Sequence, residues 1–204
     1  MKKKALVIAT LIAVCSTGLA EKLVFDFKDP KGVNTVRFTL DAPLENISGT
    51  ASGISGTVTA DPENPADISG MIVVQSKSLH VPNPLMKQHM HGDEWLDVAT
   101  YETITFELKE VTNVKRDGES GTADVKGTFT LRGISKDLVV PVSVTYLPGR
   151  LGDRSPGLVG DLLVIRSDYT IKRSDFGIKP GQAEDKVADE INVSMSIAGA
   201  APKG

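Results

Sequence analysis

Four side chains near the middle of the chain have the types that could bind a metal: Met86, His89, Met90 and His91. Thioether and imidazole groups are soft ligands that suit Cu(I) or a haem iron, as in a redox accessory protein. His89 and Met90 are adjacent, however, and on a helix their side chains diverge by about 100°. In the alternative interpretation the two methionines fill a core and His89 forms hydrogen bonds at its edge. We favour this alternative and expect no cofactor, because two or three convergent soft ligands are few for a metal site.

A repeated Arg-Ser-Asp tripeptide, at 166–168 and 173–175, is the second group of residues that could do chemistry. The copies are seven residues apart. In a strand an odd spacing places them on opposite faces, so they do not form one site. Arg173 and Asp175 do share a face. We interpret them as a structural salt bridge at the end of a strand, since exposed ion pairs are common and contribute little energy.

No motif of a known enzyme class is present. The chain has no G-x-S-x-G nucleophile elbow and no H-E-x-x-H zinc motif. Serine, aspartate and histidine occur, but their spacing does not indicate a triad. We therefore expect a protein that binds and does not catalyse.

The first twenty residues have the pattern of a secretory signal. Lys2–Lys4 form a basic start, Ala5–Val14 is apolar, and Gly18 and Ala20 are the small residues of a cleavage site after Ala20. The single cysteine, Cys15, lies inside this segment, so the mature protein has neither a disulfide nor a reactive thiol. Export without disulfides indicates the periplasm, with secretion to the medium as the alternative.

Charge and length limit the partners. Removal of three signal lysines changes the formal net charge from −3 to −6, which gives no electrostatic attraction to nucleic acid. No other segment is long enough to span a membrane, so we expect no stable membrane insertion. The sequence is compatible with either a monomer or a homodimer. The remaining chain fits one domain, expected at 21–200 with a short tail at 201–204, and is long enough to bury a core or surround a cavity.

The elements that must position these residues are mostly strands. Apolar and polar residues alternate in segments that end at turn residues. About eight strands joined by hairpins predict an antiparallel barrel or sandwich, and a closed eight-stranded barrel either fills its interior or holds one small ligand. The segments are 23–27, 36–40, 53–60, 68–76, 103–114, 123–131, 138–146, 159–171 and 190–197.

One helical segment, 83–101, interrupts the strands. Asn83 is a good N-terminal cap, and Gly92 is a good helix stop. Asp93 can begin a second short turn that contains Trp95. We expect these two small helical pieces to lie across the barrel.

Several stretches of the chain resemble segments of one known family. They are 171–178 (IKRSDFGI), 89–97 (HMHGDEWLD) with 101–106 (YETITF), 127–136 (GTFTLRGISK) and 56–65 (GTVTADPENP). In this order they resemble the C-terminal signature, the central segment, the next hairpin and the preceding strand and loop of the YceI-like family of periplasmic lipid-binding proteins. The matches cover most of 53–197.

The resemblance implies an all-β, lipocalin-like, eight-stranded antiparallel barrel. Its interior would hold a long apolar ligand: a polyisoprenoid, an isoprenoid quinone, or a fatty acyl amide or acid. The protein would bind, transport or store this lipid, with His89 or Arg173 at a polar head group. The expected wall residues, for which ordinary barrel core is the alternative, are Trp95, Ile104, Phe106, Val125, Phe129, Leu131, Val140, Val142 and Phe176.

The N-terminal part departs from the family pattern. Asn34-Thr35 stands where the family usually has a His-Ser pair, and Ala51 follows Gly49 where an aromatic residue is expected. A smaller side chain at 51 would enlarge or reshape the pocket.

Overall fold

The structure is a computed structural model, and it describes residues 22–62, 64 and 66–203. The expected signal peptide lies outside the described residues. None of the helices in the described part of the chain is long and apolar enough to cross a membrane.

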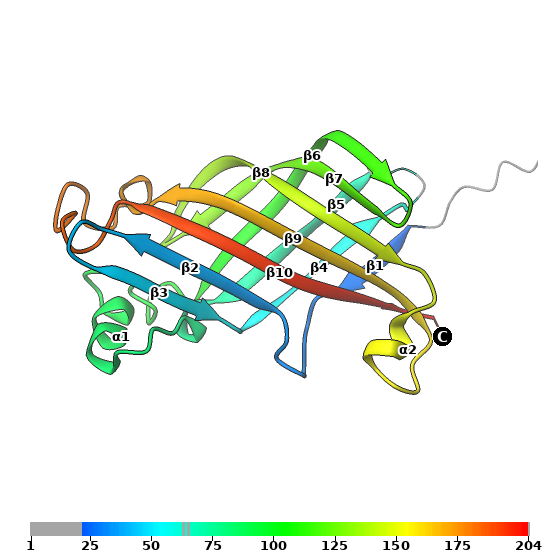
Figure 1. Cartoon of the computed structure of the whole chain (residues 1–204), viewed down its shortest axis with the longest axis horizontal. Coiled ribbons are helices and arrows are strands. Elements are labelled where there is room, and N and C mark those ends of the chain that lie inside the picture. Colours follow the sequence, from blue (N-terminus) through cyan, green and yellow to red (C-terminus); the bar gives the residue numbers. More distant parts are fainter. Residues whose placement is uncertain (1–21, 63, 65, 204) are drawn as a thin grey trace, which may run out of the picture.

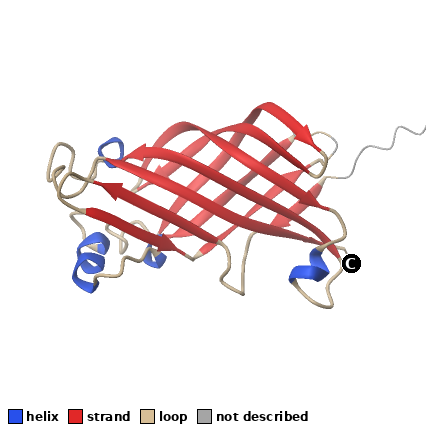
Figure 2. Ribbon diagram, in the orientation of Figure 1, coloured by secondary structure: helices blue, strands red, loops and turns tan. Residues whose placement is uncertain are grey.

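The described chain forms one curved antiparallel sheet of ten strands (Figures 1 and 2). Its order is β1-β4-β5-β6-β7-β8-β9-β10-β2-β3, and β1 also pairs with β10. Eight strands, β1 and β4–β10, therefore close a barrel, which confirms the predicted fold. The strands are β1 (Leu23–Asp26), β2 (Thr35–Asp41), β3 (Asn46–Ala51), β4 (Ile54–Ala60), β5 (Ile68–Gln75), β6 (Thr103–Asp117), β7 (Ser120–Leu131), β8 (Ile134–Leu147), β9 (Gly160–Lys172) and β10 (Glu190–Pro202).

The barrel closes differently at its two ends, because β10 has two partners along one edge. Near its C-terminal end, Ala200 pairs with Asp26 of β1. Farther back, residues 192–196 pair with β2, which in turn pairs with β3. The edge of β3 meets the main wall through a single bridge, in which Thr50 and His80 exchange two backbone hydrogen bonds of 2.9 and 2.7 Å.

The described residues form four short helices at the ends of the barrel: α1 (Pro84–His91), α2 (Leu151–Arg154) and the 3₁₀ helices η1 (Ser76–Ser78) and η2 (Arg173–Phe176). The predicted bounds of α1 are confirmed. The Asn83 side chain accepts hydrogen bonds from the N–H groups of Leu85 and Met86 at 3.0 and 3.1 Å, and Gly92 ends the helix. α1 contains no fully buried residue, but its Met86 and Met90 are partly buried against the small core cluster of Phe38, Leu40 and Val81.

The structure differs from the sequence expectations in four segments. β3 was not predicted, because Asn46–Ala51 is rich in small polar residues and lacks a clear alternation. Residues 93–100 form hydrogen-bonded turns and no second helix, with Asp93 accepting from the N–H of Glu94 at 2.9 Å. The expected loop at 148–157 contains α2. Residues 201 and 202, expected in a tail, continue β10.

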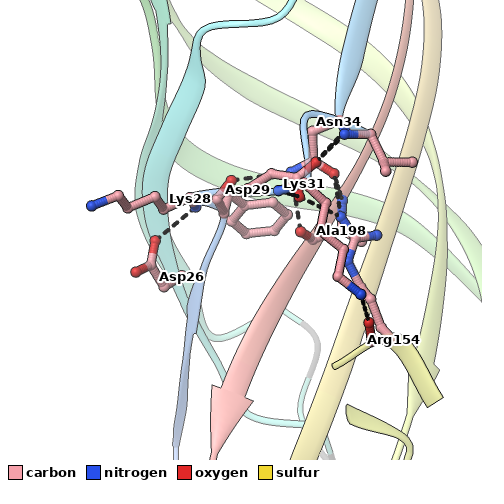
Figure 3. A network of polar contacts seen from close by, with 9 residues as sticks. Asp26, Lys28, Asp29, Lys31, Asn34, Arg154 and Ala198 are labelled. Atoms are coloured by element: carbon pink, nitrogen blue, oxygen red, sulfur yellow. Dashed lines mark hydrogen bonds and ion pairs between the residues drawn. The ribbon is translucent and has the colours of Figure 1, made fainter. Parts of the chain in front are cut away.

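A polar network fixes the loop between β1 and β2 against β10 (Figure 3). Asn34 is buried; its amide donates to the carbonyl oxygens of Phe27 and Ala198, and its side-chain oxygen accepts from the Ala198 N–H at 2.9 Å. Asp29 accepts from the backbone N–H of Asn34 and lies 3.2 Å from Arg154. Although burial raises the pKa of Asp29, the backbone N–H donors and Arg154 hold it below its usual value. Asn34 therefore stabilises the seam of the barrel, where the loop between β1 and β2 contacts β10, and it lies outside the lumen.

Candidate functional site

The barrel encloses a cavity of about 660 Å³. This volume falls within the range of about 300–1,000 Å³ that is typical of small-molecule sites. The walls are the inward-facing side chains of the strands, where one residue in two points to the interior. The cavity volume shows that these side chains do not fill the interior, and most of them are aliphatic or aromatic, so the cavity is mainly apolar.

The cavity extends to both ends of the barrel. At the α1 end, Leu85, Met86, His89 and Met90 of the helix border it together with Lys186. We name the opposite end the hairpin end, after the β6–β7 hairpin in Figure 1. There the bordering residues are Asp61, Pro62, Lys115, Arg116 and Glu119. Charged groups thus gather at the two openings.

Ten of the eleven residues expected to contact a ligand border this cavity. Phe176 is not among the described residues that border the cavity. It is almost fully buried and packs edge-on against the ring of Phe129, with ring centroids 5.5 Å apart. Phe176 therefore supports the wall from behind. The ten that border the cavity are His89, Trp95, Ile104, Phe106, Val125, Phe129, Leu131, Val140, Val142 and Arg173.

Trp95 follows α1, and two cationic side chains lie close to its ring. The guanidinium carbon of Arg173 is 5.8 Å from the indole centroid, and the ammonium nitrogen of Lys179 is 5.2 Å away. Lys179 also pairs with Glu94 at 2.7 Å. The hydrogen bond from Lys179 and the positive charge of Lys179 hold the pKa of the Glu94 carboxyl below its usual value. Trp95 thus joins the turn after α1 to the loop after η2, while part of the indole borders the cavity.

Arg173 is 1% exposed and donates only to backbone carbonyl oxygens. The predicted salt bridge to Asp175 is absent from these contacts, so the guanidinium instead organises the loop between η2 and β10. Its acceptors are Ala188 (3.2 Å), Ile178 (2.8 Å), Lys179, Gln182 (2.6 Å) and Val187 (3.1 Å). With five N–H groups and five acceptors, the guanidinium can reach a ligand head group only if one of these bonds breaks.

The four soft side chains do not form one cluster. Met86, His89 and Met90 border the cavity, whereas the Nε2 of His91 lies 2.8 Å from the carbonyl oxygen of Leu79 and must donate to it. Within the described ranges, no three His, Cys, Asp or Glu residues are placed to hold a metal ion. The helix thus presents thioethers and one imidazole to an apolar cavity.

The other bordering residues include Tyr169, which was not foreseen as a contact, and Ala51, whose small side chain was expected to enlarge or reshape the pocket. Tyr169 is in β9, and its inward position could have been found from the alternation within the predicted strand 159–171. Burial raises its pKa to about 12. Ala51 is 2% exposed and borders the cavity, so an aromatic residue there would project into the space that the alanine leaves open.

Comparisons with known proteins agree along most of the chain. The family model described as the YceI-like domain matches residues 27–198. A UPF0312 protein of Vibrio cholerae is 29% identical over 194 residues, covering 94% of this chain and 97% of the relative. A UPF0312 protein of Enterobacter sp. strain 638 is 26% identical over 206 residues and covers both chains fully.

Solved structures share the barrel. BcnA of Burkholderia cenocepacia superposes with a TM-score of 0.66 at 22% identity, covering 81% of this chain and 95% of that one. A polyisoprenoid binding domain from Saccharophagus degradans gives 0.64 at 14% identity, covering 89% and 100%. At these identities the likeness establishes the fold.

Proposed function

Because the chain belongs to the YceI-like family, we propose that it binds a long-chain lipid in the barrel lumen and carries or stores it without covalent chemistry. The observation that carries the proposal is the open apolar cavity of about 660 Å³. The similar fold of the polyisoprenoid binding domain from S. degradans supports an isoprenoid ligand. An isoprenoid quinone or a fatty acyl compound fits the same walls. The N-terminal signal pattern supports a periplasmic location for this activity, with secretion to the medium as the alternative.

The energy of such binding favours long chains. Burial of each CH₂ group contributes about 0.8 kcal/mol, so a ten-carbon chain gains ~8 kcal/mol. Loss of free motion on association costs ~4–15 kcal/mol, which offsets much of that gain. A chain of several isoprene units is therefore retained, whereas a short one exchanges with water. A lumen that extends to both ends of the barrel suits this length dependence.

The α1 end is the side on which the lipid enters. α1 has no buried residue, and its Leu85 is 60% exposed although it borders the cavity. The contacts that hold α1 are those of Met86 and Met90 with the cluster of Phe38, Leu40 and Val81. Displacement of α1 therefore breaks these side-chain contacts and uncovers the lumen without breaking the strand ladders.

The first test is to identify what the purified protein contains. Native mass spectrometry after gentle purification, followed by lipid extraction, should reveal a bound long-chain lipid. Trp95 is the single tryptophan of the chain and borders the cavity, so its emission should change as octaprenyl or long acyl ligands are added. An empty protein that takes up none of these ligands would refute the proposal.

Two variants of β3 make the test specific to the lumen. Ala51→Phe places a ring in the cavity and should weaken binding of a polyprenyl ligand at least tenfold, because part of the chain loses its space. Thr50→Phe, next along β3 and exposed, adds the same ring outside the barrel and should bind as the wild type does. Equal affinities of the two variants, with both folded by circular dichroism, would argue against a lumen site.

A further inference from the structure

The strands β8 and β9 pair along only part of their length. Their ladder comprises five residue pairs, from Leu147 with Leu162 to Ser143 with Arg166. Toward the α1 end, β8 extends back to residue 134 and β9 extends on to residue 172, and these portions, which the structure describes in full, do not pair with each other. The wall of the α1 half therefore contains a seam without backbone pairing, which we name the β8–β9 seam.

Pro141 explains where this ladder stops. Its carbonyl oxygen accepts a hydrogen bond from the Ser167 hydroxyl at 2.6 Å, so this part of the β8 backbone faces β9. In an antiparallel ladder the N–H and C=O groups of one residue point to the same neighbouring strand. Because proline has no N–H group, β8 lacks a donor at the position where the ladder with β9 would continue. The Ser167 side chain supplies one hydrogen bond there, but the ladder does not resume.

A second seam, which we name the β3 seam, borders the other edge of the same group of strands. β3 pairs with β2 over six residue pairs, but it meets the β5 side of the wall through the bridge between Thr50 and His80. These two residues exchange backbone hydrogen bonds of 2.9 and 2.7 Å, and among the described residues no further strand pairing closes this seam. Two hydrogen bonds thus take the place of a ladder.

The two seams divide the α1 half of the barrel into two leaves. The β10 leaf consists of β9, β10, β2 and β3, and the β7 leaf consists of β1 and β4–β8, each joined internally by strand ladders. At the α2 end the leaves are joined by the β8–β9 ladder, by the pairing of Asp26 with Ala200 and by the network around Asn34. The barrel in Figure 1 is thus continuous at the α2 end and divided at the α1 end.

Across the seams, the two leaves meet mainly through side chains. Beside the β8–β9 seam, Phe129 of β7 packs against Phe176, and Arg132 donates to the carbonyl oxygen of Gly177 at 2.9 Å. At the β3 seam, Phe38 of β2 belongs to the cluster against which α1 packs. Apolar side chains of both leaves also border the cavity, so a bound apolar chain covers surface that separation of the leaves exposes. Separation therefore breaks one backbone bridge and several side-chain contacts, and it leaves every ladder intact.

We propose that the two leaves swing apart at both seams about the α2 end, so that a long chain enters the lumen from the side. A chain that enters from the side does not have to move end-on through the whole length of the barrel. The same movement separates α1 from Phe38 of β2, which agrees with entry at the α1 end. The use of this opening for ligand exchange rests on the proposed function, whereas the opening itself does not.

The first test needs no ligand, because it asks whether the two seams open together. Cys15→Ser removes the single cysteine, and Val139→Cys with Thr170→Cys then places two exposed thiols across the β8–β9 seam. Both positions lie four residues beyond the last pair of the ladder, Ser143 with Arg166, in the direction of the α1 end. A cleavable bismaleimide that joins the two thiols locks this seam.

Hydrogen exchange then reports on the other seam, through the backbone N–H groups of Thr50 and His80. In the unlocked protein these two amides should show equal protection, because the opening breaks both of their hydrogen bonds together. The lock should slow the exchange of both amides about tenfold although it lies at the other edge of the leaf, and cleavage of the linker should restore the original rates. The matched control joins Ser143→Cys to Arg166→Cys, positions that are already paired, and should leave both rates unchanged.

The second test measures ligand uptake. Geranylgeraniol is mixed with wild-type, locked and control proteins, the rate of uptake is read from Trp95 emission, and the final occupancy is read by native mass spectrometry. The lock should slow uptake about tenfold, whereas the control should load as the wild type does. Asp137→Cys with Lys172→Cys, two exposed positions across the same seam, is the second lock and should give the same result. Circular dichroism checks that each variant is folded.

Each contrary outcome has a distinct meaning. Unchanged exchange at Thr50 and His80 in the locked proteins would overturn the opening of the two leaves. Slower exchange with unchanged uptake would overturn entry from the side, since the lumen would then load while the β8–β9 seam is closed. Wild-type protein that takes up no geranylgeraniol would count against the proposed function, while the exchange rates would still decide whether the leaves open.

Discussion

Arg173 permits the most quantitative prediction, because the fate of each of its donors is known. In Arg173→Lys the positive charge remains, but three N–H donors replace five. At least two of the five carbonyl oxygens therefore lose their partner. A hydrogen bond to a charged group contributes about 1.5–3 kcal/mol, so the variant should lose at least ~3 kcal/mol of unfolding free energy. For a chain of this size that corresponds to a Tm lowered by roughly 6–12 °C.

Urea unfolding at neutral pH, followed by circular dichroism, measures the loss. The matched control is Arg166→Lys in the first Arg-Ser-Asp copy, where the arginine is exposed and the change should stay within about 0.5 kcal/mol. Hydrogen exchange should accelerate in residues 178–189, which hold the carbonyl acceptors, before it accelerates in the strands. A loss below about 1 kcal/mol, or faster exchange spread evenly over the barrel, would refute the organising role of Arg173.

Three further predictions concern stability. The Asp161 carboxylate is buried; burial raises its pKa, but hydrogen bonds from Gly149 and Tyr146 and the Lys203 ammonium lower it overall. The stability that this carboxylate contributes is therefore complete above the unfolded pKa of about 3.9, and it is lost as the pH falls through the lower folded pKa. In Asp161→Asn the free energy of unfolding should therefore depend less on pH in the acid range than it does in the wild type. Asn34→Ala leaves buried backbone groups of the seam unpaired and should cost about 3 kcal/mol by urea unfolding, whereas a loss under 1 kcal/mol would contradict the network in Figure 3. Leu85→Ala should change stability by less than about 0.5 kcal/mol, in contrast to ~2–5 kcal/mol for buried Leu163→Ala; similar thermal shifts in the two would mean that α1 is part of the core.

Local signals made much of the fold predictable from the sequence. Alternation of apolar and polar residues located nine of the ten strands, because one face of the barrel wall contacts solvent and the other faces the apolar interior. The ends of α1 followed from Asn83 and Gly92, whose capping chemistry depends on neighbours a few residues away. Seven of the ten expected residues that border the cavity lie on strands and follow this alternation, whereas His89, Trp95 and Arg173 were expected from the family resemblance.

What the sequence could not supply depends on contacts between distant segments. β3 is paired because β2 lies beside it, although its own residues give a weak signal. The acceptors of Arg173 come from a loop that returns to it in space, so a salt bridge to nearby Asp175 was the simpler prediction. The alternation within 159–171 is compatible with an inward Tyr169, but its packing against the two main groups of buried side chains depends on the surrounding strands.

The double pairing of β10 also determines when the protein can fold. β10 joins β9 to both β1 and β2, and it follows the other nine strands in sequence, whereas β1 and β2 precede them among the described residues. A growing chain must therefore wait for β10 before the wall is complete, and pairings this distant in sequence form slowly. Until then the edges of β9 and β2 stay open and can pair with other molecules. A chain truncated before residue 190 would keep these edges permanently and would aggregate, even though every residue bordering the cavity up to that point is present.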